Sequence, residues 1–195
     1  MNYAEIKEYD IANGPGIRLC LFVSGCTHHC PGCFNQQTWD FGFGEPYTEE
    51  TEQHLLDLLD DPSYQGLTLL GGEPMEPANQ RALLPLFRRF KEAHPEKDIW
   101  LFTGYLFDRD LLGWESDNKE QRLPKTAIAI PETPELLSFV DVVVDGEFMQ
   151  AKKDITLLYK GSANQRTIDV PRSLAERKVV IWDPGDVSIS AMSHL

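Results

Sequence analysis

The chain has 195 residues, of which 42% are hydrophobic and 25% are charged, as is ordinary for a globular domain with a single core. Its formal net charge is −13, which excludes nucleic acid as the main partner because phosphate binding needs a concentrated basic surface. No apolar run approaches the roughly 20 residues that cross a bilayer, so we expect no membrane span.

The first residues, Met1 to Glu5, lack the basic and apolar regions of a secretory signal, so we expect a cytoplasmic protein. Thiols stay reduced in the cytoplasm, and closely spaced cysteines there bind metal or act in catalysis rather than forming disulfides. Cys20 stands apart from the other cysteines, inside an apolar run, and we expect it to be a buried core residue.

Short apolar runs alternate with amphipathic ones along the chain. The predicted strands cover residues 18–23, 66–70, 99–102, 128–130, 141–146 and 179–182. The predicted helices cover residues 48–59, where Thr48 caps the first turn, 79–93 and 135–139. Strands that alternate with helices favour a parallel sheet with crossover helices. Because a full eight-fold barrel usually needs about 250 residues, we expect an α/β fold built as a partial, open (β/α) barrel, or a small doubly wound sheet.

A cysteine loop follows the first predicted strand directly, with Cys26, Cys30 and Cys33 spaced as C-x-x-x-C-x-x-C. Three thiolates are one short of the four ligands of a four-iron cluster, so one iron would stay open for a substrate or cofactor. His28 or His29 could instead complete a zinc site, but structural zinc usually joins two well-separated ligand pairs. The chain has no second cysteine pair, so an iron–sulfur cluster is favoured and neither histidine is predicted to be a ligand.

Three further features follow predicted strands: the Gly71-Gly72 turn, Thr103 and Asp145. The carboxyl ends of parallel strands meet at one edge of a sheet, where α/β proteins place their active sites. We therefore expect these residues to converge on the cysteine loop.

This arrangement resembles the radical S-adenosylmethionine superfamily, in which the cysteine loop precedes a strand that ends in Gly-Gly-Glu, here Gly71 to Glu73. Further blocks are similar to the glycyl-radical activating enzymes, and among them to the activating proteins of anaerobic ribonucleoside-triphosphate reductases. These blocks are NGPGIR at 13–18, CPGCFN at 30–35 with Thr38 and Trp39, WLFTGY at 100–105, VDGEF at 144–148 and GSANQR at 161–166.

The resemblance implies a [4Fe–4S] cluster held by Cys26, Cys30 and Cys33, with S-adenosylmethionine chelating the open iron. One electron from the cluster would cleave the cofactor, and the 5′-deoxyadenosyl radical would take a hydrogen atom from a glycine of the reductase. The implied partners are this anaerobic ribonucleoside-triphosphate reductase, as protein substrate, and a low-potential electron donor such as a flavodoxin. Two alternatives stay open: action on another glycyl-radical protein or a small molecule, and a non-catalytic metal-stabilised interaction domain.

The cofactor-binding residues that the resemblance implies are Gly32, Cys33, Phe34, Gly71, Gly72, Glu73, Thr103 and Asp145. The two glycines of the Gly-Gly-Glu turn would let backbone approach the ammonium group of S-adenosylmethionine, and Glu73 would accept from it. Phe34 would lie beside the adenine or the sulfonium, unless it is a core aromatic. Thr103 and Asp145 would contact the ribose, the carboxylate or a cation, unless they serve only as turn residues.

We expect one domain over residues 1–195. A surface insertion near 108–134 and a tail after 170 both look longer than the compact family pattern, and the polar run 115–125 reads as a surface excursion. Asn164, Gln165 and Arg166 are expected to contact the partner or close the site, or else to form an ordinary surface loop.

Overall fold

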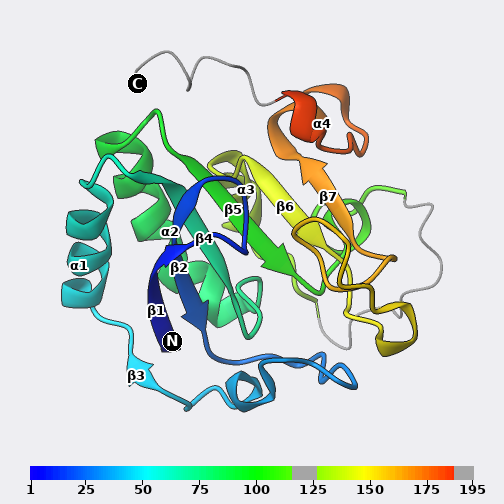
Figure 1. Ribbon diagram of the computed structural model, residues 1–195, viewed down its shortest axis with the longest axis horizontal. Coiled ribbons are helices and arrows are strands. Elements are labelled where there is room, and N and C mark those ends of the chain that lie inside the picture. The colour runs from blue at the N-terminus through cyan, green and yellow to red at the C-terminus, as the bar shows by residue number, and fades with distance from the viewer. Residues whose placement is uncertain (116–126, 187–195) are drawn as a thin grey trace.

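The computed structural model of the chain describes residues 1–115 and 127–186, and its centre is a seven-stranded sheet in the order β3-β1-β2-β4-β5-β6-β7 (Figure 1). The strands are β1 (Asn2–Asp10), β2 (Ile17–Val23), β3 (Glu45–Pro46), β4 (Tyr64–Gly71), β5 (Asp98–Thr103), β6 (Val142–Asp145) and β7 (Arg166–Asp169). The four central strands, β2, β4, β5 and β6, are parallel, and β1, β3 and β7 add antiparallel edges. The fold is α/β with a mostly parallel open sheet, as expected for a partial barrel.

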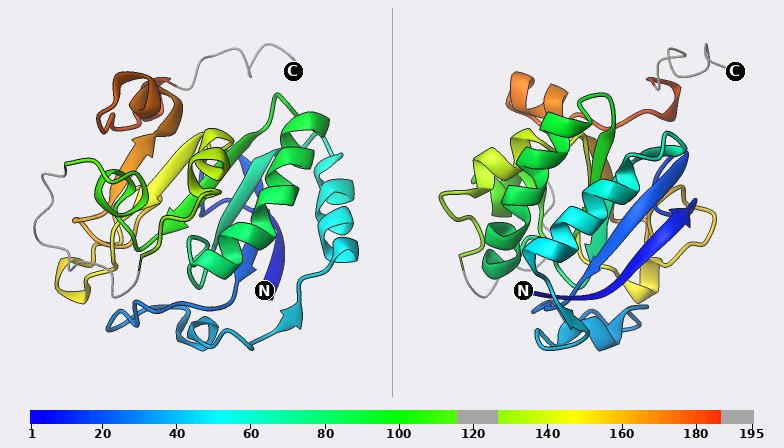
Figure 2. Two further views of the ribbon diagram at one scale, coloured as in Figure 1. Left: turned by 180° about the vertical axis from the view of Figure 1, so that it is seen from behind. Right: turned by 90° about the vertical axis from the view of Figure 1, so that its left-hand side faces the viewer.

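The helices are α1 (Glu49–Leu59), α2 (Pro77–Ala93), α3 (Thr133–Ser138) and α4 (Val170–Glu176). The first three cover one face of the sheet (Figure 2), and the main hydrophobic core lies between them and that face. In α2 the buried side chains Leu83, Phe87 and Phe90 recur at the spacing of one helical face. Among the described residues, no helix combines the length and apolarity needed to cross a membrane.

Local sequence explains where α1 begins. The Thr48 hydroxyl accepts from the backbone N–H of Thr51 at 3.3 Å, and the Thr51 side chain accepts from the backbone N–H of Thr48, which completes a capping box. Glu49 and Glu50 follow in the first turn, where negative charge complements the helix dipole. The predicted cap at Thr48 is confirmed.

The opposite face of the sheet carries a smaller cluster of Trp100, Val142 and Val144. The ring of Trp100 meets Tyr159 at 5.3 Å and Trp182 at 5.0 Å between centroids, both edge to face. These two partners come from loops, so this face is covered by chain segments that are not helices.

Two predicted strands are wrong, and the reason is local hydrogen bonding. Residues 128–130 form no strand, because the Ile128 carbonyl accepts from Gln80 of α2 and the Ile130 N–H donates to Thr133. Residues 179–182 lie beside β7 but make only an isolated bridge, Ile168 to Ile181. The Val180 carbonyl and the Trp182 N–H bond to β7, whereas the Val180 N–H donates to the Ser173 hydroxyl of α4.

The remaining differences concern the edges of the fold. Strands β1, β3 and β7 and helix α4 were not predicted, and α2 begins two residues earlier than expected, with Pro77 in its first turn. Small helical turns lie at Gln36–Trp39, Phe107–Leu111, Gln150–Lys152 and Pro184–Asp186. The predicted excursion at 115–125 falls, beyond residue 115, outside the described residues.

Candidate active site

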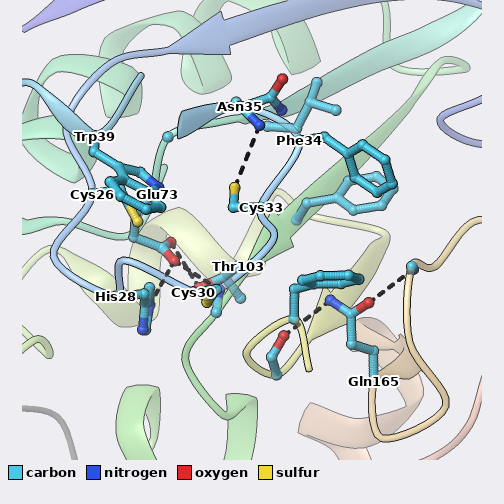
Figure 3. A pocket seen from close by; sticks show the side chains of 18 residues that line it. Cys26, His28, Cys30, Cys33, Phe34, Asn35, Trp39, Glu73, Thr103 and Gln165 are labelled. Atoms are coloured by element: carbon cyan, nitrogen blue, oxygen red, sulfur yellow. Dashed lines mark hydrogen bonds and ion pairs between the residues drawn. The ribbon is translucent and has the colours of Figure 1, made fainter. Parts of the chain in front are cut away.

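A pocket of about 200 Å³ lies at the carboxyl ends of the parallel strands, where the predicted site residues meet (Figure 3). Its wall includes Cys26, Cys30, Cys33, Phe34, Gly71, Gly72, Glu73 and Thr103. The wall also includes Leu70, Phe102, Gly146 and Gln165. The structure therefore brings together eight of the ten residues predicted for the site, whereas Gly32 and Asp145 do not line it.

The cysteine loop is closed onto the ends of β2 and β4 by backbone hydrogen bonds. The Gly25 N–H donates to the Thr38 carbonyl at 2.8 Å, and the Cys26 N–H donates to Trp39 at 3.2 Å. The Glu73 N–H donates back to the Gly25 carbonyl at 2.8 Å. Gly25 has φ +94°, a conformation that favours glycine, so this residue lets the chain turn sharply into the loop.

Backbone N–H groups face each of the three thiols. His28 and His29 donate toward Cys26, Phe148 donates toward Cys30, and the Asn35 N–H meets the Cys33 sulfur at 3.4 Å. Such bonds stabilise thiolates and tune the clusters that thiolates bind.

Burial dominates the titration of the free thiols. It raises the pKa of Cys26 to about 12 and that of Cys30 to about 11, against the opposing effect of the backbone donors. Cluster ligands are thiolates, so binding a cluster here would release protons from these cysteines.

The donor set fits an iron–sulfur cluster better than a single ion. Within residues 1–115 and 127–186, no group of three or more His, Cys, Asp and Glu side chains is placed to hold a metal ion. Cysteine thiolates are the usual ligands of iron–sulfur clusters, and because each binds a different iron, they stand further apart than the ligands of one ion. The three thiols line one pocket, one ligand short of the four of such a cluster.

Glu73 is the centre of a hydrogen-bond network under the pocket. Its side chain is 1% exposed, and one carboxylate oxygen accepts from the Met75 N–H at 2.8 Å and the Thr103 hydroxyl at 2.7 Å. The other accepts from the Gly104 N–H at 2.7 Å and meets His28 Nε2 at 3.0 Å. Glu73 thus joins the ends of β4 and β5 to the cysteine loop, and its binding of a ligand ammonium stays a prediction.

His28, a residue that the sequence did not single out for a structural role, bridges two acids. Its Nδ1 lies 3.1 Å from Glu147 Oε1 while its Nε2 meets Glu73. Burial lowers the pKa of His28, but the hydrogen bonds to Glu147 and Glu73 outweigh it and raise this pKa to about 10. The imidazole therefore links the cysteine loop to the chain after β6.

A second buried acid, Glu76, was also missed by sequence reasoning. One of its oxygens accepts from the Thr27 N–H at 3.0 Å, the Thr27 hydroxyl at 2.6 Å and the Tyr105 hydroxyl at 3.1 Å. Glu76 is 5% exposed, so these bonds anchor the middle of the cysteine loop from below. Its position just after the Gly-Gly-Glu turn was the only sequence signal.

Asp145 is completely buried but turned away from the pocket. Arg166 Nε donates to it at 2.9 Å, and the Phe107 N–H donates at 2.9 Å. Burial raises the pKa of Asp145, although Arg166 opposes this. Gly32 has φ +75°, and a side chain there would meet Gln150, so this glycine serves the turn between Cys30 and Cys33.

Two residues on the far side of the pocket complete its wall. Phe34 is 72% exposed, so it is not a core aromatic, and its ring lies 5.9 Å from that of Phe148. Gln165 donates to the Gly146 carbonyl at 3.0 Å and accepts from the Gly161 N–H at 2.9 Å (Figure 3). Of the 164–166 block, Gln165 alone lines this pocket, while Asn164 donates to the Glu147 carbonyl.

Comparison with known proteins agrees with this geometry. Residues 12–168 match the family described as a 4Fe-4S single cluster domain. The chain is 44% identical over 167 residues to the "anaerobic ribonucleoside-triphosphate reductase-activating protein" of Vibrio cholerae, covering 85% of this chain and 96% of that protein. Proteins with the same description are 39% identical in Escherichia coli K12, with the same coverage, and 40% identical in Enterobacteria phage T4, covering 85% and 92%.

Proposed function

Because the chain belongs to the family of anaerobic ribonucleoside-triphosphate reductase-activating proteins, we propose that it activates such a reductase by generating a glycyl radical on it. It is a radical S-adenosylmethionine enzyme with a [4Fe–4S] cluster. The observation that carries the proposal is the meeting of three thiols and the Gly-Gly-Glu turn in one pocket. When bound, the reduced cluster and S-adenosylmethionine supply the one-electron bond cleavage that leads to loss of a hydrogen atom from a reductase glycine.

The chain's own residues prepare that site. Cys26, Cys30 and Cys33 are proposed as the cluster ligands, and the backbone donors toward their sulfurs support the charge that the thiolates carry. Gly71 and Gly72 are proposed to leave room for the amino acid part of S-adenosylmethionine.

The remaining pocket residues are proposed to position the ligand or its surroundings. Cys33 and Phe34 would flank the adenosyl group, with Gly32 behind them, while Thr103 and Glu73 would form the floor of the site. Asp145 is proposed to act through Arg166, since its carboxylate is held by that guanidinium.

Three finer parts of the function are also proposals. A low-potential donor such as a flavodoxin would reduce the cluster, and the protein would work in the cytoplasm. A single domain over 1–195, with an insertion near 108–134 and an extended tail after 170, is compatible with the one continuous sheet of the described residues.

The test is anaerobic reconstitution with iron and sulfide, followed by addition of S-adenosylmethionine, a reductant and the reductase. We expect a glycyl doublet on the reductase by electron paramagnetic resonance, together with methionine and 5′-deoxyadenosine. A cluster-bearing protein that cleaves S-adenosylmethionine but never forms the doublet would favour another substrate. A colourless protein without cleavage would refute the radical chemistry altogether.

Two cysteine variants control the assignment of the ligands. Cys30→Ala should lose iron and cleavage, whereas Cys20→Ala should keep both, because Cys20 is a buried residue of β2. A Cys30→Ala protein that cleaved at the wild-type rate would remove Cys30 from the ligand set.

A further inference from the structure

Exposed side chains lie at the pocket wall and on the loop that adjoins it. Phe34 lines the pocket and is 72% exposed, and it contacts Phe148, which lines the same pocket. Lys153 Nζ lies 4.7 Å from the centre of the Phe34 ring, a cation–π contact. Ile155, two residues further along, is 90% exposed. We call Phe34, Phe148, Lys153 and Ile155 the docking rim.

The loop over residues 153–162 carries two of the four rim residues, Lys153 and Ile155, and it is fixed at its base. Lys153 pairs with Ser162, and the Asp154 N–H donates to the Gly161 carbonyl at 3.3 Å. At the tip, the Asp154 carboxylate accepts from the Thr156 N–H at 2.8 Å. Gly161 lies in the pocket wall, so the base of the loop adjoins the site while its tip holds Ile155 out in solvent.

The charge of this loop is opposite to that of the molecule. Residues 150–160 contain three lysines and one aspartate, whereas the whole chain has a formal net charge of −13. A basic patch on an acidic protein attracts acidic partners, so complementary charge would steer their association toward this loop.

An exposed apolar group next to a reaction pocket has a direct use when the substrate is a protein. The target glycine must reach the pocket while the rest of its chain stays outside and contacts the protein surface around the pocket opening. Large exposed apolar and aromatic side chains at such positions are typical of binding sites for polypeptide.

We infer that the docking rim binds the segment of the reductase that carries the target glycine, and that this segment presents apolar side chains flanked by acidic ones. The inference rests on the proposed function. It assigns recognition of the partner to Phe34, Phe148, Lys153 and Ile155, next to the cofactor site but outside the cluster ligands.

The test compares two rim variants with a matched control. Ile155→Asp and Lys153→Glu place negative charge on the docking rim. Ile11→Asp makes the same apolar-to-acid change at a residue that is 75% exposed. Ile11 follows β1, whose Asp10 pairs with Arg18 near the start of β2. Ile11 therefore lies at the amino end of β2, whereas the pocket lies at its carboxyl end.

The readout is the rate of glycyl-radical formation as a function of reductase concentration, by electron paramagnetic resonance. Both rim variants should raise the KM for the reductase about tenfold, the effect of losing one of the minority of contacts that matter at an interface. Iron content and cleavage of S-adenosylmethionine without reductase should match wild type, as should every property of Ile11→Asp. The Lys153→Glu effect should shrink at high salt.

The outcomes separate the two proposals. A wild-type protein that forms no glycyl radical overturns the proposed function. If the wild type is active and Ile155→Asp has the same KM for the reductase as Ile11→Asp, the docking rim is overturned. Loss of iron or of reductase-free cleavage in Ile155→Asp overturns it too, since the side chain would then act on the cofactor site. Sedimentation of the activator alone tests one more outcome. If the activator is a dimer that Ile155→Asp dissociates, the docking rim binds a second copy of this chain and not the reductase.

Discussion

At the scale of single residues, the site depends on buried acids as much as on cysteines. Glu73 and Glu76 are 1% and 5% exposed, and each of them holds a different part of the cysteine loop through side-chain bonds. Buried carboxylates are costly unless their oxygens are fully paired, and here they are paired by backbone N–H groups, hydroxyls and an imidazole. The part of the loop between Cys26 and Cys30 is therefore held in place by Glu73 and Glu76.

The bridge made by His28 can be tested directly. His28→Ala removes one charge-assisted bond each to Glu73 and Glu147, so it should lower the free energy of unfolding of the metal-free protein by about 2–4 kcal/mol. Denaturant unfolding under anaerobic conditions measures this loss.

The neighbouring histidine is the control for that bridge. His29 is exposed, and its ring lies 4.7 Å from that of Trp39 between centroids. His29→Ala should therefore change the free energy of unfolding by no more than about 0.5 kcal/mol. Equal effects of the two variants would show that the bridge contributes nothing.

The sequence allowed some of these residues to be predicted and not others. Cys26, Cys30 and Cys33 lie on one short loop, so their convergence is local and readable. The bridge through His28 joins three distant segments, and no local pattern reports their mutual orientation. Asp145 ends β6 in register with Thr103 of β5, yet only Thr103 lines the pocket. The Asp145 carboxylate is taken up by Arg166 and the Phe107 N–H, which come from distant segments that no local pattern reveals.

At the scale of elements, the site is a set of loops packed against the ends of β2, β4, β5 and β6. The close contact of two of these loops leaves no room at Gly72. A Cβ atom there would lie 2.7 Å from the Gly25 carbonyl oxygen, 2.9 Å from that of Thr38 and 3.0 Å from that of Val23. All three are backbone atoms, which cannot rotate away as side chains do.

Gly72→Ala should therefore push the cysteine loop away from β4. We expect a loss of about 1–3 kcal/mol in the free energy of unfolding, as for other overpacked sites, and less iron bound per chain after reconstitution. Gly42→Ala is the control, because its nearest neighbour is Asp40 Oδ1 at 3.5 Å. Normal iron content in Gly72→Ala would mean that the loop tolerates the shift.

The elements that could be predicted are those whose own residues specify them. Strands β2, β4, β5 and β6 are continuous apolar runs because both of their faces are buried. Strand β1 is mostly exposed or half-buried, with no apolar run, so its pairing with β2, and at its start with β3, makes it a strand. The apolar run 179–182 shows the reverse, since it lies beside β7 but forms only one isolated bridge with it, Ile168 to Ile181.

At the scale of the whole molecule, the two faces of the sheet are covered differently. Helices α1, α2 and α3 close one face, whereas loops bring Tyr159 and Trp182 onto Trp100 of the other. The mostly parallel sheet was predictable from alternating strands and helices. Which loops would cover the second face was not, because those contacts join residues 100, 159 and 182, far apart in the chain.

Trp182 should be an anchor of that second face. Trp182→Ala removes the edge-to-face contact with Trp100 and part of its packing, so we expect a loss of about 1–3 kcal/mol in the free energy of unfolding. The near-ultraviolet circular dichroism of the aromatic cluster should weaken as well.

The adjacent residue serves as a control for Trp182. Ile181 is 57% exposed, so Ile181→Ala should stay within about 0.5 kcal/mol of wild type. If both variants unfold like wild type, the segment that carries them adds no stability to the sheet.

The loop over residues 153–162 is held at its two ends and free at its tip. Within the described residues, the side-chain bonds at the tip join Asp154 to Thr156 and stay inside the loop, while Lys153 at the base contacts Phe34. Substitutions at the tip can therefore accumulate without disturbing the thiols. Under the docking-rim proposal, partner choice can then drift between lineages while the chemistry stays constant. Activators exchanged between organisms should then differ in how well they match a foreign reductase, and grafting this single loop should transfer the preference.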